Sequence, residues 1–350
     1  MELLNNIFIV VRDIIANFLV GTLGIPSWIS DAFLTVVAIV VFVVFCIVNV
    51  IFQVLAERKI VGFVQDRMGP NRVGPWGLLQ MVADTLKLLT KEDIFPSAAD
   101  RWAYRLAPIV ILSAALLVYA VIPFGRGMVI ADVNIGILYL VSISSLATIG
   151  FLMAGWGSNN KYSLLGSMRS VAQMVSYEIP LVLSIIGVIM LTGSLQMTQI
   201  VGGQGGLWFI VWQPLGFIVY FISAIAEINR CPFDLPEAES ELIAGYHTEY
   251  SGMRFALLYL AEYINAFTVA AVATTLFLGG WQGPILPPYI WFFIKSWVIF
   301  WVMLWIRDTL PRVRVDHLMG FAWKVLIPLA LVNIFITGAV LVPLFQSLAK

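Results

Sequence analysis

The segment 227–250, EINRCPFDLPEAESELIAGYHTEY, concentrates groups that can carry negative charge or protons. It holds six carboxylates beside a single arginine, Arg230. The carboxylates are Glu227, Asp234, Glu237, Glu239, Glu241 and Glu249. The whole chain is 61% hydrophobic and only 11% charged, whereas a soluble domain is about one quarter charged. The composition indicates a membrane protein in which this acidic segment has a specific chemical use.

Two further carboxylates, Glu178 and Glu262, lie inside apolar runs. An ionised group at membrane depth costs about 2.5 kcal/mol or more, so each needs a reason. Both lie eight residues into their runs, about 12 Å along a helix, and both enter from the same side. Pro180 removes a backbone donor beside Glu178 and makes room for water or a partner.

Together with Glu227, which ends its own apolar run, these carboxylates favour a hydrated proton path. Buried carboxylates that influence one another can exchange protons near neutral pH. Two alternatives stay open: each glutamate makes a structural hydrogen bond or pairs with Lys295, or the oxygen ligands serve sodium.

Apolar runs of about 20 residues are long enough to cross a bilayer. The sequence has eight, at 32–55, 106–124, 134–156, 171–191, 208–226, 255–278, 286–306 and 322–345. We therefore predict an all-α integral membrane protein, one polytopic domain over 1–350 with about eight transmembrane helices. Residues 1–30 are expected to be a peripheral segment, with an interfacial helix over 3–23 favoured over a ninth span because of Arg12 and Asp13.

Positive charge sets the predicted orientation, because lysine and arginine are retained in cytoplasmic loops. The segments 57–105, 157–170, 227–254 and 307–324 hold sixteen of the twenty lysines and arginines. These loops should be cytoplasmic and both termini should lie outside. No transit or signal peptide stands out, which favours a bacterial cytoplasmic membrane. A net charge of zero and no basic face argue against nucleic acid.

The loop 57–105 should contain an amphipathic helix at the cytoplasmic interface. Within 77–93, apolar residues recur at 3, 4, 3 spacing and polar residues fall on the other side. The apolar positions are Leu79, Val82, Leu86 and Leu89, and the polar ones are Asp84, Lys87 and Lys91.

The acidic loop 227–254 should be ordered rather than a solvated charge run. Pro232 and Pro236 prevent a regular helix between them. The loop also carries apolar side chains, Leu235, Leu242, Ile243, Tyr246 and Tyr250, which a solvated loop does not need. We expect these side chains to contact a cytoplasmic partner.

The sequence offers little for metal or redox chemistry. Cys46 and Cys231 form no CxxC pair, and His247 and His317 stand alone. The GGQGG at 202–206 reads as a turn rather than a phosphate loop. We expect no flavin, iron–sulfur cluster or metal on this chain.

Three long segments resemble one known family. They are AERKIVGFVQDRMGPNRVGPWGLLQMVADTLKLLTKED (56–93), KYSLLGSMRSVAQMVSYEIP (161–180) and AEINRCPFDLPEAESELIAGYHTEYSG (226–252). They look like the H subunit of respiratory complex I, the proton-translocating NADH:quinone oxidoreductase, called subunit 1 in mitochondria. The resemblance covers nearly the whole chain past residue 30.

The resemblance implies a membrane subunit that forms part of a quinone chamber and couples quinone reduction to proton translocation. By resemblance, the chamber residues are Glu57, Arg58, Arg67, Asp84 and Lys87. The proton-pathway residues are Glu178, Glu227, Asp234, Glu237, Glu239, Glu241, Glu249 and Glu262, with Arg230 as counter-charge. The implied substrate is ubiquinone or menaquinone. The implied partners are quinone-site and iron–sulfur subunits of the peripheral arm, other membrane-arm subunits and the lipid bilayer.

Two other functions stay open at this point. The chain could be the homologous membrane subunit of a membrane-bound hydrogenase or another quinone- or ion-coupled dehydrogenase. It could also be a stand-alone ion or solute carrier, but that reading leaves the apolar residues of the acidic loop unexplained.

Overall fold

The computed structural model describes residues 7–22, 26–236 and 239–348. Within these ranges the chain forms helices and no strand, apart from one isolated bridge between Gly125 and Met128. The long helices are α3 (Ser27–Val64), α5 (Arg101–Leu117), α6 (Gly136–Gly157), α7 (Lys161–Thr192), α10 (Pro214–Glu227), α12 (Gly252–Phe277) and α13 (Pro288–Thr309). A last crossing consists of α14 (Val315–Phe321), α15 (Ile327–Ile336) and α16 (Val342–Leu348), joined by the π-helical turns Ala322–Leu326 and Thr337–Leu341.

Shorter helices lie at the two ends of the bundle. They are α2 (Ile7–Asn17), α4 (Leu79–Thr90), α8 (Met197–Gly202), α9 (Phe209–Trp212) and α11 (Glu239–Leu242), with 3-10 turns at Pro75–Gly77, Val118–Val121 and Gly245–His247 and a π-helical turn at Phe18–Thr22.

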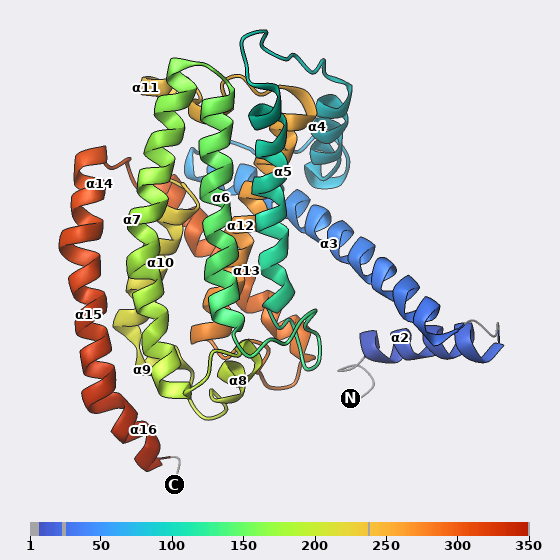
Figure 1. The fold of residues 1–350 in the computed structure, drawn as a ribbon, viewed down its shortest axis with the longest axis vertical. Coiled ribbons are helices and arrows are strands. Elements are labelled where there is room, and N and C mark those ends of the chain that lie inside the picture. Colours follow the sequence, from blue (N-terminus) through green and yellow to red (C-terminus); the bar gives the residue numbers. More distant parts are fainter. Residues whose placement is uncertain (1–6, 23–25, 237–238, 349–350) are drawn as a thin grey trace.

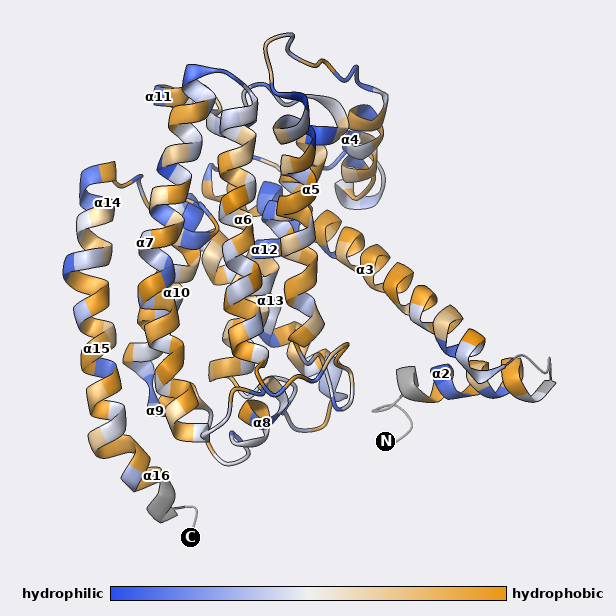
Figure 2. Cartoon of the chain, in the orientation of Figure 1, coloured by the Kyte–Doolittle hydropathy of each residue, from blue (hydrophilic) through white to orange (hydrophobic). Residues whose placement is uncertain are grey.

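The long helices run side by side along one axis, except for α3, which slants away from the bundle (Figure 1). The helices α4 and α11 lie at the upper end in this view, and α8 and α9 lie at the lower end. Both α2 and α16 also lie toward the lower end. Hydrophilic residues gather at the upper end, around α4 and α11 (Figure 2).

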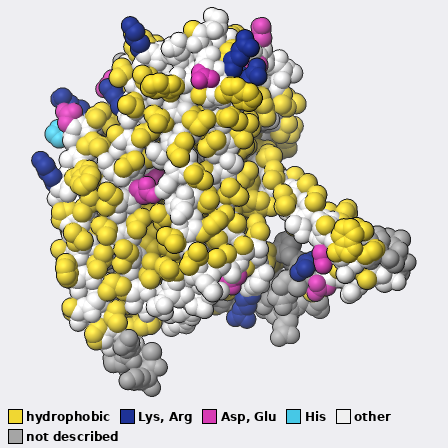
Figure 3. Space-filling view, in the orientation of Figure 1, with side chains coloured by type: hydrophobic (Ala, Val, Ile, Leu, Met, Phe, Trp, Pro, Cys, Tyr) yellow, Lys and Arg dark blue, Asp and Glu magenta, His cyan; other side chains and the backbone are white. Residues whose placement is uncertain are grey.

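The helix α12 forms the centre of the bundle and packs against α5, α13, α3 and α10. The C-terminal half of α12 carries several small side chains, such as Ala270, Ala271 and Thr274, which are all fully buried. Small residues let neighbouring helices approach closely in a membrane protein. The core is therefore tight at α12, while the outer surface is dominated by hydrophobic side chains (Figure 3).

Seven helices in the described part of the chain are long and apolar enough to cross a membrane, and α10 is a shorter apolar helix. The all-α integral membrane fold predicted from the sequence is thus confirmed. The prediction of one continuous span over 208–226 is wrong: the run breaks at Gln213 (φ −131°, ψ 59°), between α9 and α10. Pro214 disfavours helical geometry in the residue before it, which accounts for the break.

The amphipathic helix lies at residues 79–90, close to the predicted position. Its four apolar residues Leu79, Val82, Leu86 and Leu89 are exposed, whereas Met81 is buried against the bundle. An exposed apolar face is what a helix resting on a lipid surface would present.

The N-terminal helix α2 lies across the far end of α3 (Figure 1). Its 11 residues lead directly into the π-helical turn Phe18–Thr22. The interfacial helix expected over 3–23 extends beyond the described residues at both ends and stays a prediction.

The acidic loop packs against its own chain, contrary to our expectation of a partner contact. Leu235, Leu242, Tyr246 and Tyr250 are all buried, and only Ile243 is exposed. Tyr250 stacks on Tyr104 of α5 with ring centroids 4.3 Å apart. The apolar residues of the loop therefore fix it to the bundle, an outcome that needs contacts between segments far apart in sequence.

Candidate functional site

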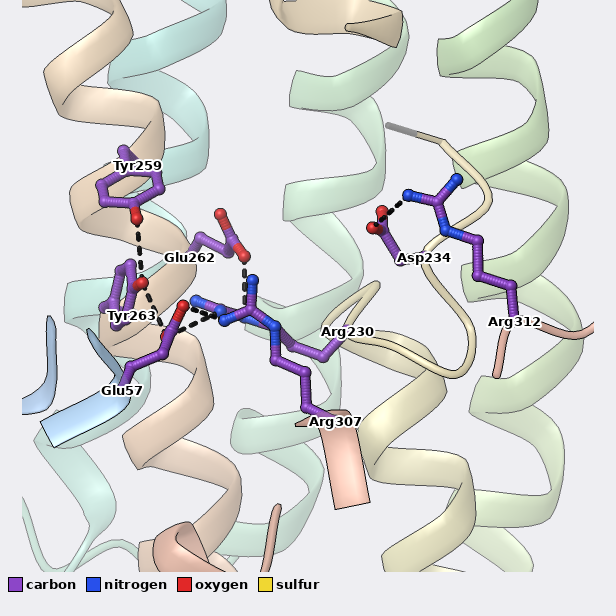
Figure 4. A network of polar contacts seen from close by, with 8 residues as sticks. All are labelled: Glu57, Arg230, Asp234, Tyr259, Glu262, Tyr263, Arg307 and Arg312. Atoms are coloured by element: carbon purple, nitrogen blue, oxygen red, sulfur yellow. Dashed lines mark hydrogen bonds and ion pairs between the residues drawn. The ribbon is translucent and has the colours of Figure 1, made fainter. Parts of the chain in front are cut away.

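A cluster of ionised side chains lies where α3, α12, α13 and the acidic loop meet (Figure 4). Glu57 comes from α3, Glu262 from α12, Arg307 from α13 and Arg230 from the loop. Glu57 and Arg230 are almost fully buried. The cluster joins residues that are up to 250 positions apart in the sequence.

Arg230 bridges the two carboxylates. Its Nη1 lies 3.1 Å from Oε2 of Glu57, and its Nε lies 2.7 Å from Oε1 of Glu262. Its guanidinium also sits over the Tyr263 ring, 4.3 Å from the centroid. A cation held by two carboxylates and an aromatic face is fixed in both position and charge.

Glu57 has three partners. Besides Arg230, it pairs with Arg307 and accepts a hydrogen bond of 2.7 Å from the Tyr263 hydroxyl. The Tyr259 hydroxyl continues the chain, 2.9 Å from that of Tyr263.

The cluster is balanced in charge, with two carboxylates against two guanidiniums. Burial alone would lower the pKa of Arg230, but the carboxylates of Glu262 and Glu57 beside it raise that pKa well above its usual value. Arg230 therefore stays cationic. Such a group is costly to bury alone and stable only with its partners.

A pocket of about 390 Å³ opens beside the cluster, lined by Glu57, Arg58, Val61, Arg67 and Pro70. It lies at the end of α3 that carries the basic residues. Three of the five residues assigned to the quinone chamber by resemblance line this one pocket.

The other two chamber residues belong to α4. Asp84 lies 2.6 Å from Nη1 of Arg58 and accepts a hydrogen bond from Gln80. It thereby ties α4 to the pocket wall. Lys87 is exposed on α4 and does not line the pocket.

A separate, partly enclosed cavity of about 70 Å³ lies inside the bundle. Both Glu227 and Glu262 line it, together with polar groups of Ser144, Asn229 and Thr268. One water needs about 10–15 Å³ of such space. The cavity is therefore large enough for several waters in contact with two carboxylates.

Glu227 and Glu178 have a different environment from Glu57 and Glu262. Ser145 donates a hydrogen bond to Oε1 of Glu178, and Glu227 interacts with the hydroxyl of Ser144. The two carboxylates are close enough to act on each other electrostatically. Among the described residues, neither forms an ion pair.

The remaining loop acids whose side chains the structure describes make separate contacts and do not line the cavity. Asp234 pairs with Arg312 at 3.1 Å (Figure 4). Glu241 pairs with Arg169 at 2.6 Å. These contacts hold the loop to its neighbours.

Glu249 belongs to the same group of loop acids. It accepts a hydrogen bond of 2.6 Å from Asn160, at the start of α7. Glu237 lies outside the described residues. Glu239 is the first residue of α11, and its side chain also falls outside them.

Within the described ranges, Lys295 forms no ion pair with a glutamate. Its Nζ donates hydrogen bonds to the carbonyl oxygens of Leu278, Gly280 and Gln282, at 2.6, 3.2 and 2.6 Å. Lys295 therefore binds carbonyl oxygens just beyond the end of α12. The alternative that the buried glutamates pair with Lys295 is excluded for the described glutamates.

Sequence reasoning missed several partners of the acidic residues. Arg307 and Tyr263 complete the central cluster, and Arg312 and Asn160 hold loop acids. One signal was available: Arg307 ends an apolar run in the same charged region as Glu57. The pairing itself depends on contacts that no local pattern shows.

The fold and the site define a class: a polytopic α-helical membrane protein with paired charges at one end and carboxylates facing an internal cavity. The part of the chain that the structure describes holds no group of three or more His, Cys, Asp or Glu suited to a metal ion.

Comparisons with known proteins identify the family within this class. A family model described as NADH dehydrogenase matches residues 37–338. The H subunit of the NADH-quinone oxidoreductase of Dehalococcoides mccartyi (strain CBDB1) is 58% identical over 294 residues, which cover 84% of this chain and 83% of the relative. That of Anoxybacillus flavithermus is 53% identical over 320 residues, which cover 90% and 96%. The second of the numbered H subunits of Geobacter sulfurreducens is 51% identical over 314 residues, which cover 87% and 95%. The chain belongs to this NADH dehydrogenase family.

Proposed function

We propose that this chain is the membrane subunit of an NADH:quinone oxidoreductase that forms part of the quinone chamber and couples quinone reduction to proton translocation. One observation carries the proposal. Glu57 lines the pocket at the end of α3 and pairs with Arg230, which pairs with Glu262, which lines the internal cavity. An unbroken series of charged contacts thus connects the pocket with the cavity.

The pocket residues would act on the quinone by charge and position. Arg58 and Arg67 present cations to the pocket, and Asp84 fixes Arg58. Lys87 would act from the neighbouring face of α4, outside the pocket wall. Reduction of a quinone changes its charge or its protonation, which alters the field at Glu57. A change there can favour a different arrangement of the Arg230 contacts.

The proton route would then involve Glu262, Glu227 and Glu178. Glu262 and Glu227 face the same cavity, and Glu178 acts electrostatically on Glu227. We assign Asp234, Glu241 and Glu249 the supporting role of holding the acidic loop in place, through Arg312, Arg169 and Asn160.

The orientation, location and partners follow from the same reading. The end that carries α4 and the acidic loop would face the cytoplasm of a bacterium and meet the peripheral-arm quinone-site and iron–sulfur subunits. Other membrane-arm subunits would lie along the apolar sides. The substrate would be ubiquinone or menaquinone, and the flavin and iron–sulfur clusters would reside on the partner subunits.

A pull-down of the tagged chain from gently solubilised membranes tests this function. We expect flavin and iron–sulfur subunits to be recovered with it, together with NADH:quinone turnover that a quinone-site inhibitor blocks. Recovery with nickel–iron hydrogenase subunits would contradict the assignment. Recovery of the chain alone, with ion flux in liposomes, would contradict it as well.

A further inference from the structure

A long groove runs along the outside of the bundle between α3 and α13. Its volume is about 660 Å³, and its walls are formed by α3 from Phe45 to Phe63 and by Phe293, Trp297 and Trp301 of α13. None of its lining residues belongs to the pocket at Glu57 or to the internal cavity. The groove is therefore a separate feature from the proposed quinone and proton sites.

The dimensions of the groove suit a lipid chain. The distance from Phe45 to Lys59 is 14 helical steps, about 21 Å along α3. Since α3 slants relative to the bundle axis (Figure 1), the groove spans a depth smaller than this length, on the scale of one leaflet, which is roughly half of a 30 Å hydrocarbon core. Apart from Asn49 and Lys59, the lining side chains are hydrophobic.

The groove has a cation at one end. Lys59 is the basic residue in its lining, and it lies at the end of α3 where basic residues gather. Its Nζ sits 5.9 Å from the centre of the Trp76 ring. Across the described ranges, Lys59 forms no ion pair, whereas Arg58, Arg230 and Arg312 each bind a carboxylate.

Tryptophans occur on the α13 side of the groove. Trp301 is more than half exposed, and Trp305, one turn further toward the basic end, is also exposed. Indole rings favour the level of lipid headgroups. Apolar walls, tryptophans toward one end and an unpaired lysine at that end together match the chemistry of a phospholipid.

We propose that this groove binds one anionic phospholipid, with an acyl chain between α3 and α13 and the phosphate at Nζ of Lys59. An anionic headgroup supplies the negative charge that Lys59 lacks, whereas a zwitterionic headgroup brings its own cation. A quinone head is uncharged and leaves Lys59 unpaired. Attraction of one surface lysine to anionic lipid corresponds to about a fivefold preference.

Photolabelling of the purified, assembled complex tests the proposal. Two probes with the same diazirine-bearing acyl chain are used, one a phosphatidylglycerol and the other a phosphatidylcholine, in nanodiscs of unlabelled phosphatidylcholine. We expect the phosphatidylglycerol probe to label peptides containing 45–63 and 293–301, about fivefold more than the phosphatidylcholine probe. This preference should disappear in Lys59→Gln.

Two further variants separate charge from structure. Lys59→Arg keeps the charge and should keep the preference for phosphatidylglycerol. Lys91→Gln removes an exposed lysine at the same end of the bundle, outside the groove, and should change nothing. Equal labelling by both probes, or an unchanged preference in Lys59→Gln, would overturn the proposal. Absence of labelling in the groove would mean that another subunit covers it, which would also overturn it.

Discussion

Two sets of carboxylates lie within the same bundle and differ in what surrounds them. Glu57 and Glu262 contact arginines, and Arg230 contacts both. Glu178 and Glu227 interact with the hydroxyls of serines instead. The first set lies where helices and loop meet, and Glu227 of the second faces the internal cavity.

The difference shows how one membrane bundle can hold acids for two purposes. Cations offset the cost of ionised carboxylates in the first set, so that set can fix the arrangement of α3, α12, α13 and the loop. In the second set serine hydroxyls take the place of arginines, and Glu227 also faces space for water; this is the set to which we assign the proposed proton route. Glu262 belongs to both settings because it pairs with Arg230 and lines the cavity.

The largest expected effect on stability comes from Arg230→Gln. This change leaves Glu262 without its arginine and removes one partner of Glu57. Loss of one partner from a buried pair costs about 3–5 kcal/mol. We expect poor assembly and a clearly lower melting temperature of the solubilised complex.

The matched control for that variant is Arg126→Gln, an exposed arginine in the loop between α5 and α6. It should assemble and melt as the parent does. If Arg230→Gln also melts at the parent temperature, the ion pairs of the first set do not hold the fold together.

A smaller effect is expected from Arg58→Ala, which changes the pocket next to the first set of carboxylates, Glu57 and Glu262. Arg58 lines the pocket and binds Asp84. We expect the KM for quinone to rise about tenfold, equivalent to about 1.4 kcal/mol. Electron transfer from NADH to a water-soluble acceptor should be unchanged.

Arg72→Ala is the control for the pocket, because Arg72 is exposed on the same loop and does not line it. Its quinone kinetics should match those of the parent. Loss of both activities in Arg58→Ala would indicate failed assembly and would remove the assigned role of Arg58.

Ser145→Ala tests the role of the serine contacts in the second set of carboxylates, Glu178 and Glu227. The change removes the hydroxyl that donates to Glu178, a contact of about 1 kcal/mol. We expect the rate of proton translocation in proteoliposomes to change about fivefold, with only a slight shift of the melting temperature. Ser142→Ala, on the exposed side of α6, should leave both values alone. A stability loss without a change in proton movement would place Glu178 among the structural acids.

The smallest effect is expected from Arg312→Gln. Its pair with Asp234 is partly exposed, with 38% and 20% of the two side chains accessible. Exposed pairs contribute less than about 1 kcal/mol. The melting temperature of the complex should shift only slightly. A fall in melting temperature as large as that of Arg230→Gln would mean that the partly exposed Arg312–Asp234 pair stabilises the fold as much as the buried pairs of Arg230 do.

The sequence was sufficient for the features that depend on local pattern. Long apolar runs predicted the spans, and the spacing of Leu79, Val82, Leu86 and Leu89 predicted α4. The break at Gln213 was missed because an apolar run conceals it, although Pro214 was a usable signal.

The contacts of the site required the fold. Glu57, Arg230 and Glu262 were identified as important, but the pairing of Glu57 with Arg230 spans 173 positions. The stacking of Tyr250 on Tyr104 also joins distant segments and shows how an apolar side chain of the loop is buried within its own chain. Spacing along a helix cannot reveal contacts of this kind.

The most direct test of the proposed coupling is the number of protons moved per quinone reduced by Glu227→Gln in proteoliposomes. Glu227 is tied to no arginine among the described residues and faces the cavity. We expect an intact complex whose proton translocation falls at least tenfold. Normal pumping and turnover in an intact Glu227→Gln complex would contradict the proposed role of the second set.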